Sequence, residues 1–591
     1  MTTNDAAAAA TVPETTADPR RADRLRTRLV WALVALAVLV HLPALMAPFM
    51  LDDWAQTAMT EGHFGAPRSP FDLYDYVDDG NRGQLFDQGV IPWWTHPQLV
   101  VRFFRPLSSA LVWADHALFG RHTVWHHAHS LVWWALAVVG VHALLSRSFS
   151  RRTALLGTAV FAFAPCHVMP LLWLANREVL VSAALGVWAL VWYERWRDGR
   201  QPRAGLVSLA LFSAAVLAGE YTLGFVGYVL AIELVRRRES LARRALGVSV
   251  FVLPIAAYLV AHVALHYDAH GSGFYRNPLY DTGDYARGAP RRLATLLGEA
   301  WLGVDDTWVG SSSWALALLG VGTVALLAVP VVRLLRDLER EERRRATWLL
   351  AGSVLSLAPV LSVAPSVRLL AVSMIGVSAI VGLLLDRAWF PPTPPPRRGA
   401  AEWASLVALL LGFAHFVRGP LDTCLLEKNT IQASTAFADR IAWLRAHIDR
   451  AKSTVFVIRG DTAETVLWAP MMLGDAAPPH WRVLTFASGR SLLLRTGEKS
   501  LELVASDRPL FHVGPDDLFR SYDALQPGDS VALGGMRATV LKVDEHEMPR
   551  RLRFEMDRDL DDPSYEWITE GDDGFREETL PPKGYGQPVL P

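Results

Sequence analysis

Two adjacent carboxylates follow the first long apolar block of the chain, in the segment FMLDDWAQ. Asp52 and Asp53 would therefore lie at a membrane surface, where a carboxylate can meet a lipid-borne substrate and a water-soluble acceptor. A carboxylate within hydrogen-bonding distance of a hydroxyl can take its proton as a general base. The alternative is that both side chains only cap the helix that follows.

Three arginines, Arg105, Arg177 and Arg368, stand at the ends of later apolar blocks. The guanidinium group is always ionised, and its planar donors match the oxygens of a phosphate. A charge beside hydrocarbon is costly unless it has a partner. These arginines could therefore bind the phosphate of a lipid carrier, and the alternative is that each one only extends towards lipid headgroups.

Five histidines crowd one short stretch, and His126 and His129 have the spacing of one helical face. Such a pair could bind a divalent metal. Polar contacts between packed helices are the more common explanation, so the sequence supports no metal site and no certain cofactor. The five residues are His116, His122, His126, His127 and His129.

The composition places the chain in a membrane. Of its 591 residues, 51% are hydrophobic, and they fall into long blocks, as a lipid solvent requires. The net charge of -1 excludes a global field that would attract nucleic acid. Only two cysteines are present, Cys166 and Cys424, which excludes a disulfide scaffold and a cysteine-based metal site.

The apolar blocks predict a mostly α, polytopic transmembrane bundle of about 11 helices. Arginine clusters follow alternate blocks, so the positive-inside rule places those connections and the N-terminus in the cytoplasm. With this count, the C-terminus lies outside the cytoplasm. The predicted helices cover 28–47, 124–146, 153–168, 177–194, 204–219, 221–235, 245–266, 313–333, 346–364, 368–386 and 402–418.

The N-terminal residues 1–26 predict a disordered cytoplasmic tail, and the block after them, without a cleavage site, predicts a retained anchor. The transmembrane domain, 27–420, contains two long outer loops at 48–123 and 267–312, and 291–308 is expected at the interface. Six tryptophans fit an interfacial aromatic belt. They are Trp93, Trp94, Trp113, Trp125, Trp133 and Trp134.

Beyond the last predicted span, 430–591 predicts a soluble extracytoplasmic domain of α+β or mostly β structure. The stretch 431–451 has helical spacing. Apolar residues alternate in several later segments, and Gly534-Gly535 between two of them indicates a β-hairpin. The alternating residues are Leu501 and Leu503; Val531 and Leu533; and Leu552, Phe554 and Met556.

The order and spacing of the apolar segments resemble a known class of enzymes. The segments are FFRPLSSALVWADHALFG, WHHAHSLVWWALAVVGVHALL, FAFAPCHVMPLLWLANREVLV, AGEYTLGFVGY and APSVRLLAVSMIGVSAIVG. Together they resemble the GT-C class of polyprenyl-phosphate-sugar-dependent glycosyltransferases, in particular protein O-mannosyltransferases and the transmembrane mannosyltransferases that usually carry tetratricopeptide repeats. The resemblance covers about 28–390. The tetratricopeptide repeats are absent, and the C-terminal domain is different.

The resemblance assigns roles to five charged positions. It implies that the acidic pair Asp52 and Asp53 contains the catalytic base. Arg105, followed by proline, matches the family's Arg-Pro segment, and Arg177 and Arg368 match arginines ahead of the fourth and tenth helices. These three would bind the lipid phosphate.

Three further positions match only in part. His126 begins a His-x-x-Asn pattern that has histidine in place of asparagine, and His167 stands in a Pro-x-His-x-Glu stretch that ends in Met169 instead. Glu220 keeps the acid of a Lys-Glu pair. The resemblance places His126, His167 and Glu220 in substrate binding.

We therefore expect an integral multi-pass glycosyltransferase of a bacterial inner membrane, a hexosyltransferase acting with inversion. It would move a sugar, with mannose as one candidate, from a polyprenyl-phosphate carrier to a hydroxyl of a protein, lipid or polysaccharide on the outer face. Two alternatives are a transporter or flippase for a lipid-linked saccharide and a non-catalytic receptor or assembly scaffold. The charges at helix ends and the lack of an inverted repeat favour the transferase.

Overall fold

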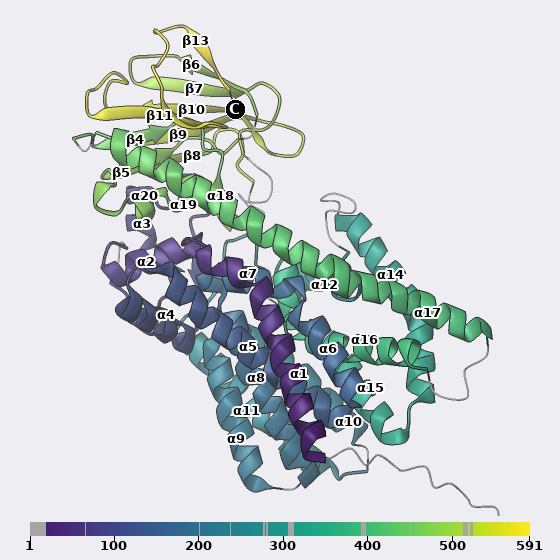
Figure 1. Cartoon of the computed structure of the whole chain (residues 1–591). Coiled ribbons are helices and arrows are strands. Elements are labelled where there is room, and N and C mark those ends of the chain that lie inside the picture. Colours follow the sequence, from purple (N-terminus) through teal and green to yellow (C-terminus); the bar gives the residue numbers. More distant parts are fainter. Residues whose placement is uncertain are drawn as a thin grey trace, which may run out of the picture.

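A helical bundle and a β-rich domain lie end to end, and the long helix α18 (Gly419–His447) runs from one to the other (Figure 1). This computed structural model describes residues 19–590, except 65–66, 200, 237, 276–277, 279–281, 305–312, 392–397, 450, 488, 512–517 and 521–523. The expected mostly α fold with β structure near the C-terminus is confirmed.

Helices cover all the apolar segments that predicted them. Two of them begin directly after a capping serine, as at α6, where the Ser150 side chain accepts a hydrogen bond from the N–H of Thr153. The helices are α1 (Pro19–Val40), α5 (Thr123–Ser148), α6 (Arg151–Ala162), α7 (Val168–Leu172), α8 (Glu178–Gly199), α9 (Pro202–Ala218), α10 (Phe225–Val235), α11 (Leu241–Ala264), α12 (Thr282–Leu302), α14 (Ser313–Asp337), α15 (Arg340–Leu355), α16 (Ser373–Trp389) and α17 (Arg398–Phe413).

Among the described residues, six helices are long and apolar enough to cross a membrane, or seven if the bent pair α6 and α7 forms one span. The expected count of about eleven spans is not confirmed, because several helices are short: α10 has 11 residues, and a span needs about 20. Large apolar side chains face outward on the long helices, with Leu253 63% and Val260 69% exposed. Such faces indicate an integral membrane protein.

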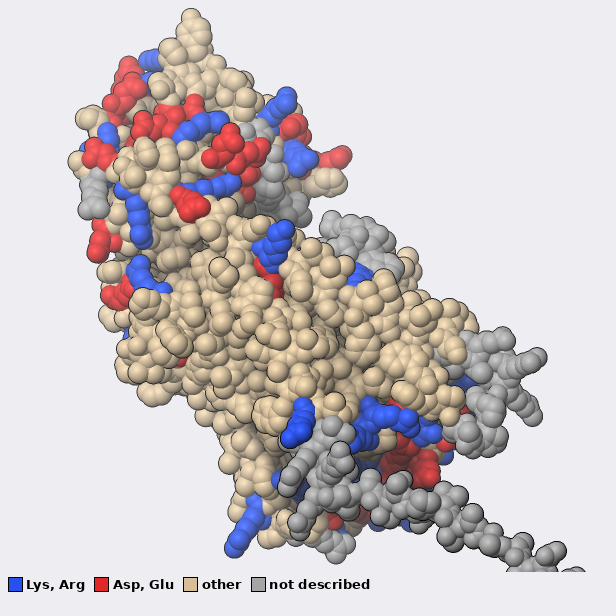
Figure 2. All heavy atoms as spheres, viewed as in Figure 1, with Lys and Arg blue, Asp and Glu red and all other residues tan. Residues whose placement is uncertain are grey.

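Charge is sorted along the long axis of the molecule. Figure 2 shows acidic and basic side chains at the two ends of the visible face and a broad uncharged band between them. A band of this kind is what the hydrocarbon core of a bilayer selects.

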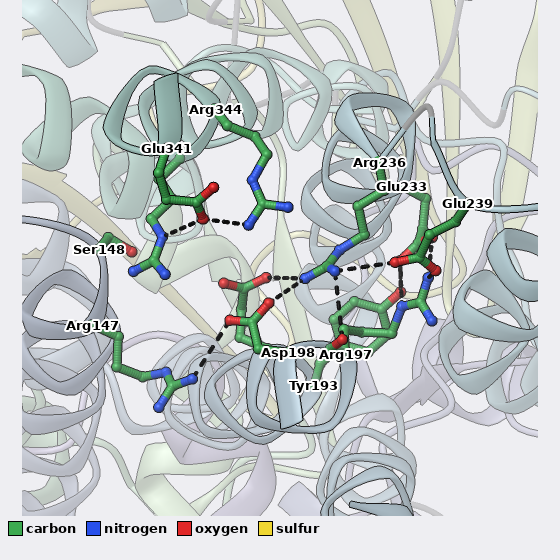
Figure 3. A network of polar contacts seen from close by, with 12 residues as sticks. Arg147, Ser148, Tyr193, Arg197, Asp198, Glu233, Arg236, Glu239, Glu341 and Arg344 are labelled. Carbon is green, nitrogen blue, oxygen red and sulfur yellow. Dashed lines mark hydrogen bonds and ion pairs between the residues drawn. The ribbon is translucent and has the colours of Figure 1, made fainter. Parts of the chain in front are cut away.

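At the end opposite the β-rich domain, arginines of three connections, Arg147, Arg197 and Arg236, meet in one ion-pair network, and Glu341 and Arg344 form a separate pair beside it (Figure 3). The Arg197 guanidinium places two nitrogens 2.8 Å from the two carboxylate oxygens of Glu233, and the Tyr193 hydroxyl donates to Glu233 at 2.6 Å. Arg236 Nη2 lies 2.7 Å from Asp198 Oδ1. These contacts fasten α8 to the end of α10.

The structure differs from two predicted segments, the disordered tail and the interfacial segment, in where helices begin and end. Of the predicted disordered tail, 1–18 lies outside the described residues, and α1 already begins at Pro19, inside the predicted range. The predicted interfacial segment 291–308 falls in α12 as far as Leu302, and its residues 305–308 lie outside the described part of the chain.

The chain stays helical across the boundary that was expected between the last span and the soluble domain. A π-helical turn, Ala414–Arg418, connects α17 to α18, and α18 continues through the segment predicted as a separate helix at 431–451 until His447. No glycine or proline interrupts this stretch after Pro420, so one helix serves both parts.

The β-rich domain consists of two sheets. The larger has the order β13-β6-β7-β10-β9-β8, with antiparallel pairs throughout, and the smaller has the order β12-β11-β4-β5, with β4 parallel to both neighbours. The strands are β4 (Thr454–Val457), β5 (His480–Val483), β6 (Ser491–Arg495), β7 (Ser500–Ala505), β8 (Ser530–Leu533), β9 (Met536–Val543), β10 (Pro549–Met556), β11 (Tyr565–Gly571), β12 (Gly574–Glu577) and β13 (Gly586–Val589).

The predicted hairpin and alternation are confirmed in the larger sheet. Leu533 pairs with Met536 across the two-residue turn, in which Gly535 has a φ of 82°. Leu501, Leu503 and Phe554 are buried in the core of the domain.

The first long loop shares a hydrophobic core with this domain. It contains α2 (Asp52–Glu61), β1 (Asp75–Val77), α3 (Arg82–Gln88), β2 (Val100–Arg102) and α4 (Pro106–Phe119). Trp93 and Trp94, predicted in an interfacial belt, are instead buried against Phe511, and the Trp93 indole donates to the carbonyl of Leu484 at 3.0 Å. That prediction is wrong for these two residues because the loop and the β-rich domain bury them together.

Candidate active site

The backbone is strained directly before the acidic pair. Leu51 has a φ of 49° and precedes the first residue of α2, a conformation that a residue with a branched side chain adopts only when its surroundings force it. The forcing contacts come from Asp53. Its carboxylate accepts hydrogen bonds from the backbone N–H groups of Met50 (3.1 Å), Leu174 (3.3 Å) and Ala175 (2.7 Å).

Asp53 is therefore a buried connection between α2 and the turn ahead of α8. It is only 2% exposed. Burial raises the pKa of its carboxyl to about 7, although the three backbone donors oppose the rise. Its oxygens accept hydrogen bonds from backbone N–H groups, whereas the neighbouring Asp52 is partly exposed.

Asp52 is partly exposed at the start of α2 and faces charges from three other segments. Burial raises the pKa of its carboxyl to about 6, and the positive charges of Arg368 and Arg105 act in the opposite direction. The Glu178 carboxylate raises this pKa further, and a hydrogen bond from the Trp468 side chain lowers it. A carboxyl with this pKa is mostly ionised at neutral pH and is more basic than a solvated aspartate.

Arg105 lies directly before α4 and is held from several sides. Its Nε is 2.8 Å from Glu220 Oε2 and its Nη1 is 3.2 Å from Glu178 Oε1. Its guanidinium also lies over the rings of Tyr74, at 5.0 Å, and Phe103, at 4.5 Å. Two carboxylates and two rings fix this cation in place, as desolvated arginine requires.

Glu178 and Glu220 each have another partner besides Arg105. Asn176 Nδ2 donates to Glu178 Oε1 at 3.0 Å, and the Tyr258 hydroxyl donates to Glu220 Oε1 at 3.0 Å. Among the described residues, the other oxygen of Glu178 is buried and has no hydrogen-bond partner. A buried carboxylate oxygen without a donor is costly.

Arg368 is the predicted arginine with the most freedom. It lies in the short 3-10 turn Val367–Leu370, and its guanidinium lies 5.2 Å from the centre of the Trp173 ring. Within the described part of the chain it makes no hydrogen bond and no ion pair. Tyr221, Tyr275 and Glu178 act on its charge electrostatically. Its donors are available to an anion.

A cavity of about 810 Å³ begins beside this turn. Its lining includes Ser366 and Val367, directly ahead of Arg368, together with residues of α12, the start of α14, and α18. Leu316, Leu425 and Leu426 contribute apolar surface. Charged residues of α12 and α18 also line the cavity, namely Arg291, Arg292, Glu299 and Asp422. The cavity offers room for an apolar chain next to a free guanidinium.

Arg177, also predicted to bind phosphate, belongs to a different cluster. It is 2% exposed and pairs with Asp115 of α4, and its Nη1 lies 3.1 Å from His129 Nδ1. His126 lies in the same cluster, with its Nε2 3.0 Å from the carbonyl oxygen of Gly120. Arg177 and His126 thus serve the packing of α4, α5 and α8.

His167 lies inside the helical core. It is 1% exposed, its Nε2 is 2.9 Å from the carbonyl oxygen of Phe161, and its ring packs edge-on against Phe161 and Trp134. It does not contact Asp52, Arg105 or Arg368. Among the residues that the structure describes, no group of three or more His, Cys, Asp or Glu side chains could hold a metal ion.

We predict that Asp115→Asn destabilises the protein by about 3–5 kcal/mol, because it leaves the buried Arg177 without its counter-ion. Thermal unfolding in detergent would measure the loss. Asp79→Asn is the matched control, since Asp79 is 88% exposed and pairs with Arg82 at 2.5 Å on the surface, where such pairs contribute little. Equal stability of the two variants would contradict the buried role.

The sequence reasoning missed Glu178, Tyr221, Tyr275 and Trp468. Glu178 follows Arg177 directly, and a buried acid at the start of an apolar helix is itself a signal. Trp468 comes from the β-rich domain, between α19 (Ala463–Leu467) and α20 (Ala469–Leu473), and no local pattern connects it to Asp52.

No protein-family profile and no curated protein sequence matches the chain. Among solved structures, it is similar to ArnT from Cupriavidus metallidurans bound to undecaprenyl phosphate, with 15% identity and a TM-score of 0.42, over 77% of this chain and 85% of that one. The archaeal oligosaccharyltransferase AglB from Archaeoglobus fulgidus, in complex with an inhibitory peptide and a dolichol-phosphate, has 13% identity and a TM-score of 0.41, over 76% and 64%. The arabinofuranosyltransferase AftD from Mycobacteria has 15% identity and a TM-score of 0.41, over 90% and 40%.

Proposed function

We propose that the protein is a membrane glycosyltransferase that moves a sugar from a polyprenyl-phosphate carrier to a hydroxyl acceptor on the non-cytoplasmic face. The observation that supports this most directly is that the positive charge of Arg368, which has no ion pair among the described residues, acts on the partly exposed carboxylate Asp52 at one end of an apolar bundle. A base and an anion donor at this depth suit a substrate that joins a lipid chain to a phosphate.

In the proposed reaction, Asp52 takes the proton of the acceptor hydroxyl. The hydroxyl oxygen forms a bond to the anomeric carbon of the sugar from the face opposite the phosphate, so the anomeric configuration inverts. The bond from this carbon to the phosphate oxygen breaks, and the electron pair leaves with the phosphate. Arg368, to which no carboxylate of the described residues is bound, stabilises the growing negative charge.

Arg105 has a positioning role in this proposal. It forms ion pairs with Glu178 and Glu220, so its main role is to orient these two carboxylates and not to bind the phosphate. The unpartnered oxygen of Glu178 would accept a hydrogen bond from a sugar hydroxyl. The cavity beside Val367 would receive the first isoprene units of the carrier.

The test is a reconstituted assay. The full-length protein in liposomes would receive a radiolabelled polyprenyl-phosphate hexose, with mannose tried first, and an envelope extract as the acceptor source. Label that moves from the lipid phase to the acceptor, with one free polyprenyl phosphate formed for each sugar, supports the proposal. Movement of the intact carrier across the bilayer without product would indicate a flippase and overturn it.

In this proposal a residue of the β-rich domain, Trp468, lowers the pKa of the catalytic base Asp52. Trp468→Phe keeps an aromatic ring but removes the indole N–H that lowers the pKa of Asp52. The pKa should rise, and the acidic limb of the pH–rate profile should move to higher pH. Transfer at pH 6 should fall about two- to fivefold, while transfer at pH 8 stays unchanged.

The matched control for this variant is Trp567→Phe, in the same domain. It removes an indole N–H that donates to the carbonyl of Leu560 at 3.0 Å and does not act on Asp52. Its pH profile should overlay that of the unchanged protein. A shift of equal size in both variants would show that the effect comes from the domain's packing and not from the Asp52 contact.

A further inference from the structure

The larger sheet of the β-rich domain has a short open edge at β8. This strand is the last in the sheet order, and β9 is its neighbour, with Val531 opposite Ala538 and Leu533 opposite Met536. Figure 1 shows β8 on the side of the sheet that faces the bundle and α3. A strand in this position exposes part of its backbone.

The register decides which backbone groups are exposed. Leu533 and Met536 flank a two-residue turn, so they form a hydrogen-bonded pair, and alternate residues of β8 then turn their N–H and C=O groups away from β9. Those residues are Ser530 and Ala532. Among the described residues, no hydrogen bond outside the sheet reaches the backbone of either one.

This edge forms one wall of a cavity of about 990 Å³. Five consecutive residues, 530–534, line it on one side, and α3 contributes Gly83, Gln84 and Phe86 on the other. Four strand residues extend over about 13 Å at about 3.3 Å per residue. An extended polypeptide can add as a further strand to an exposed sheet edge of this kind.

The charges around the slot are already balanced. The lining carries two acidic residues, Asp79 and Asp87, and two basic residues, Arg82 and Arg520. Asp79 pairs with Arg82 at 2.5 Å. The slot therefore has no excess charge to select a phosphate or an acidic polymer. Phe86 and Leu533 supply apolar surface, so we expect a peptide in which apolar and small polar side chains alternate.

We propose that the slot between β8 and α3 binds an extended polypeptide segment, which adds as a strand to the edge of the sheet. The backbone of Ser530 and Ala532 would exchange hydrogen bonds with alternate residues of the peptide. The partner is a polypeptide on the same side of the membrane as the β-rich domain. This binding is independent of sugar transfer, so either proposal can fail without the other.

The experiment uses the full-length protein in detergent and a fluorescein-labelled peptide of about six residues that alternates Thr and Val. Fluorescence anisotropy should show saturable binding with a Kd of about 10–100 μM. Ala532→Pro removes one outward N–H at an edge position that tolerates proline, and it should weaken binding at least about tenfold. Ala532→Val, which keeps the N–H, is the matched control and should bind normally.

Peptides methylated on alternate backbone nitrogens give the sharpest result. Methylation of one set should abolish binding and methylation of the other set should not, because only alternate residues pair with β8. Equal binding of both sets, or no saturable binding up to about 1 mM, would overturn the proposal. Self-association of the protein that Ala532→Pro abolishes would assign the edge to a second copy of the chain and would also overturn it.

Discussion

Asp52→Asn is expected to reduce sugar transfer about 10²–10⁴-fold while the carrier still binds. The amide has nearly the same shape as the carboxylate but cannot take a proton, and the partly exposed side chain leaves little stability to lose. Initial rates of transfer from a radiolabelled polyprenyl-phosphate sugar would measure the effect. Retention of the carrier by the variant, measured by filter binding, would show that the site is intact.

Asp53→Asn is the matched control on the neighbouring residue. The Asp53 carboxylate accepts three backbone hydrogen bonds, and an amide keeps one acceptor oxygen. This variant should lose stability, and its transfer rate per folded molecule should fall less than that of Asp52→Asn. If the Asp53 variant were stable and inactive while the Asp52 variant stayed active, the base would be Asp53.

The same carboxylate sets the pH dependence. Burial raises the pKa of Asp52 to about 6, so the basic form dominates above that pH and disappears below it. The kcat/KM of transfer should therefore fall about tenfold per unit below pH 6 and reach a plateau above it. The Asp52→Asn variant should lose this acidic limb.

The charged residues that the sequence singled out separate into two groups. Asp52, Arg105, Arg368 and Glu220 meet around Glu178 although they come from different segments of the chain. Each of them stands at the end of an apolar segment in the sequence, and helices that pack side by side bring such ends together. The position of these residues in the sequence could therefore predict that they lie close together, but not which of them contact one another.

Arg177 shows what such a pattern cannot predict. It too stands at a helix end, but its guanidinium forms a buried ion pair with Asp115, a residue far from it in sequence. Only the packing of α4 against α8 decides whether an arginine at a helix end faces a cavity or a carboxylate. His126 and His167 are alike in this respect, because each satisfies a nearby carbonyl oxygen inside the bundle.

In the fold too, features that depend on neighbouring residues could be predicted, and contacts between segments far apart in the sequence could not. Apolar periodicity located the helices, and the Gly534-Gly535 turn located a hairpin, because both depend on neighbours in sequence. The burial of Trp93 against Phe511 depends on two segments that meet only in the folded chain. Trp468 reaches Asp52 for the same reason, so the contribution of the β-rich domain to the site could not be predicted.

Arg368→Lys is expected to lower kcat/KM about 10²-fold, and Arg368→Gln about 10³-fold. Lysine keeps the charge but lacks the planar pair of donors that can bind two phosphate oxygens at once, and glutamine lacks the charge as well. Most of the loss should appear in kcat, because the negative charge on the phosphate grows in the transition state. Steady-state kinetics with the radiolabelled donor would separate kcat from KM.

The control for this series is Arg121→Lys, in the first long loop. Arg121 Nε lies 2.6 Å from Glu61 Oε1 in an exposed pair, so its replacement should leave transfer within about twofold. Arg368, in contrast, is bound to no carboxylate in the part of the chain that the structure describes, so in this proposal its donors can bind the phosphate. Activity that survives in Arg368→Gln would mean that the leaving phosphate is stabilised elsewhere, and Arg105 would be the remaining cation within reach of Asp52.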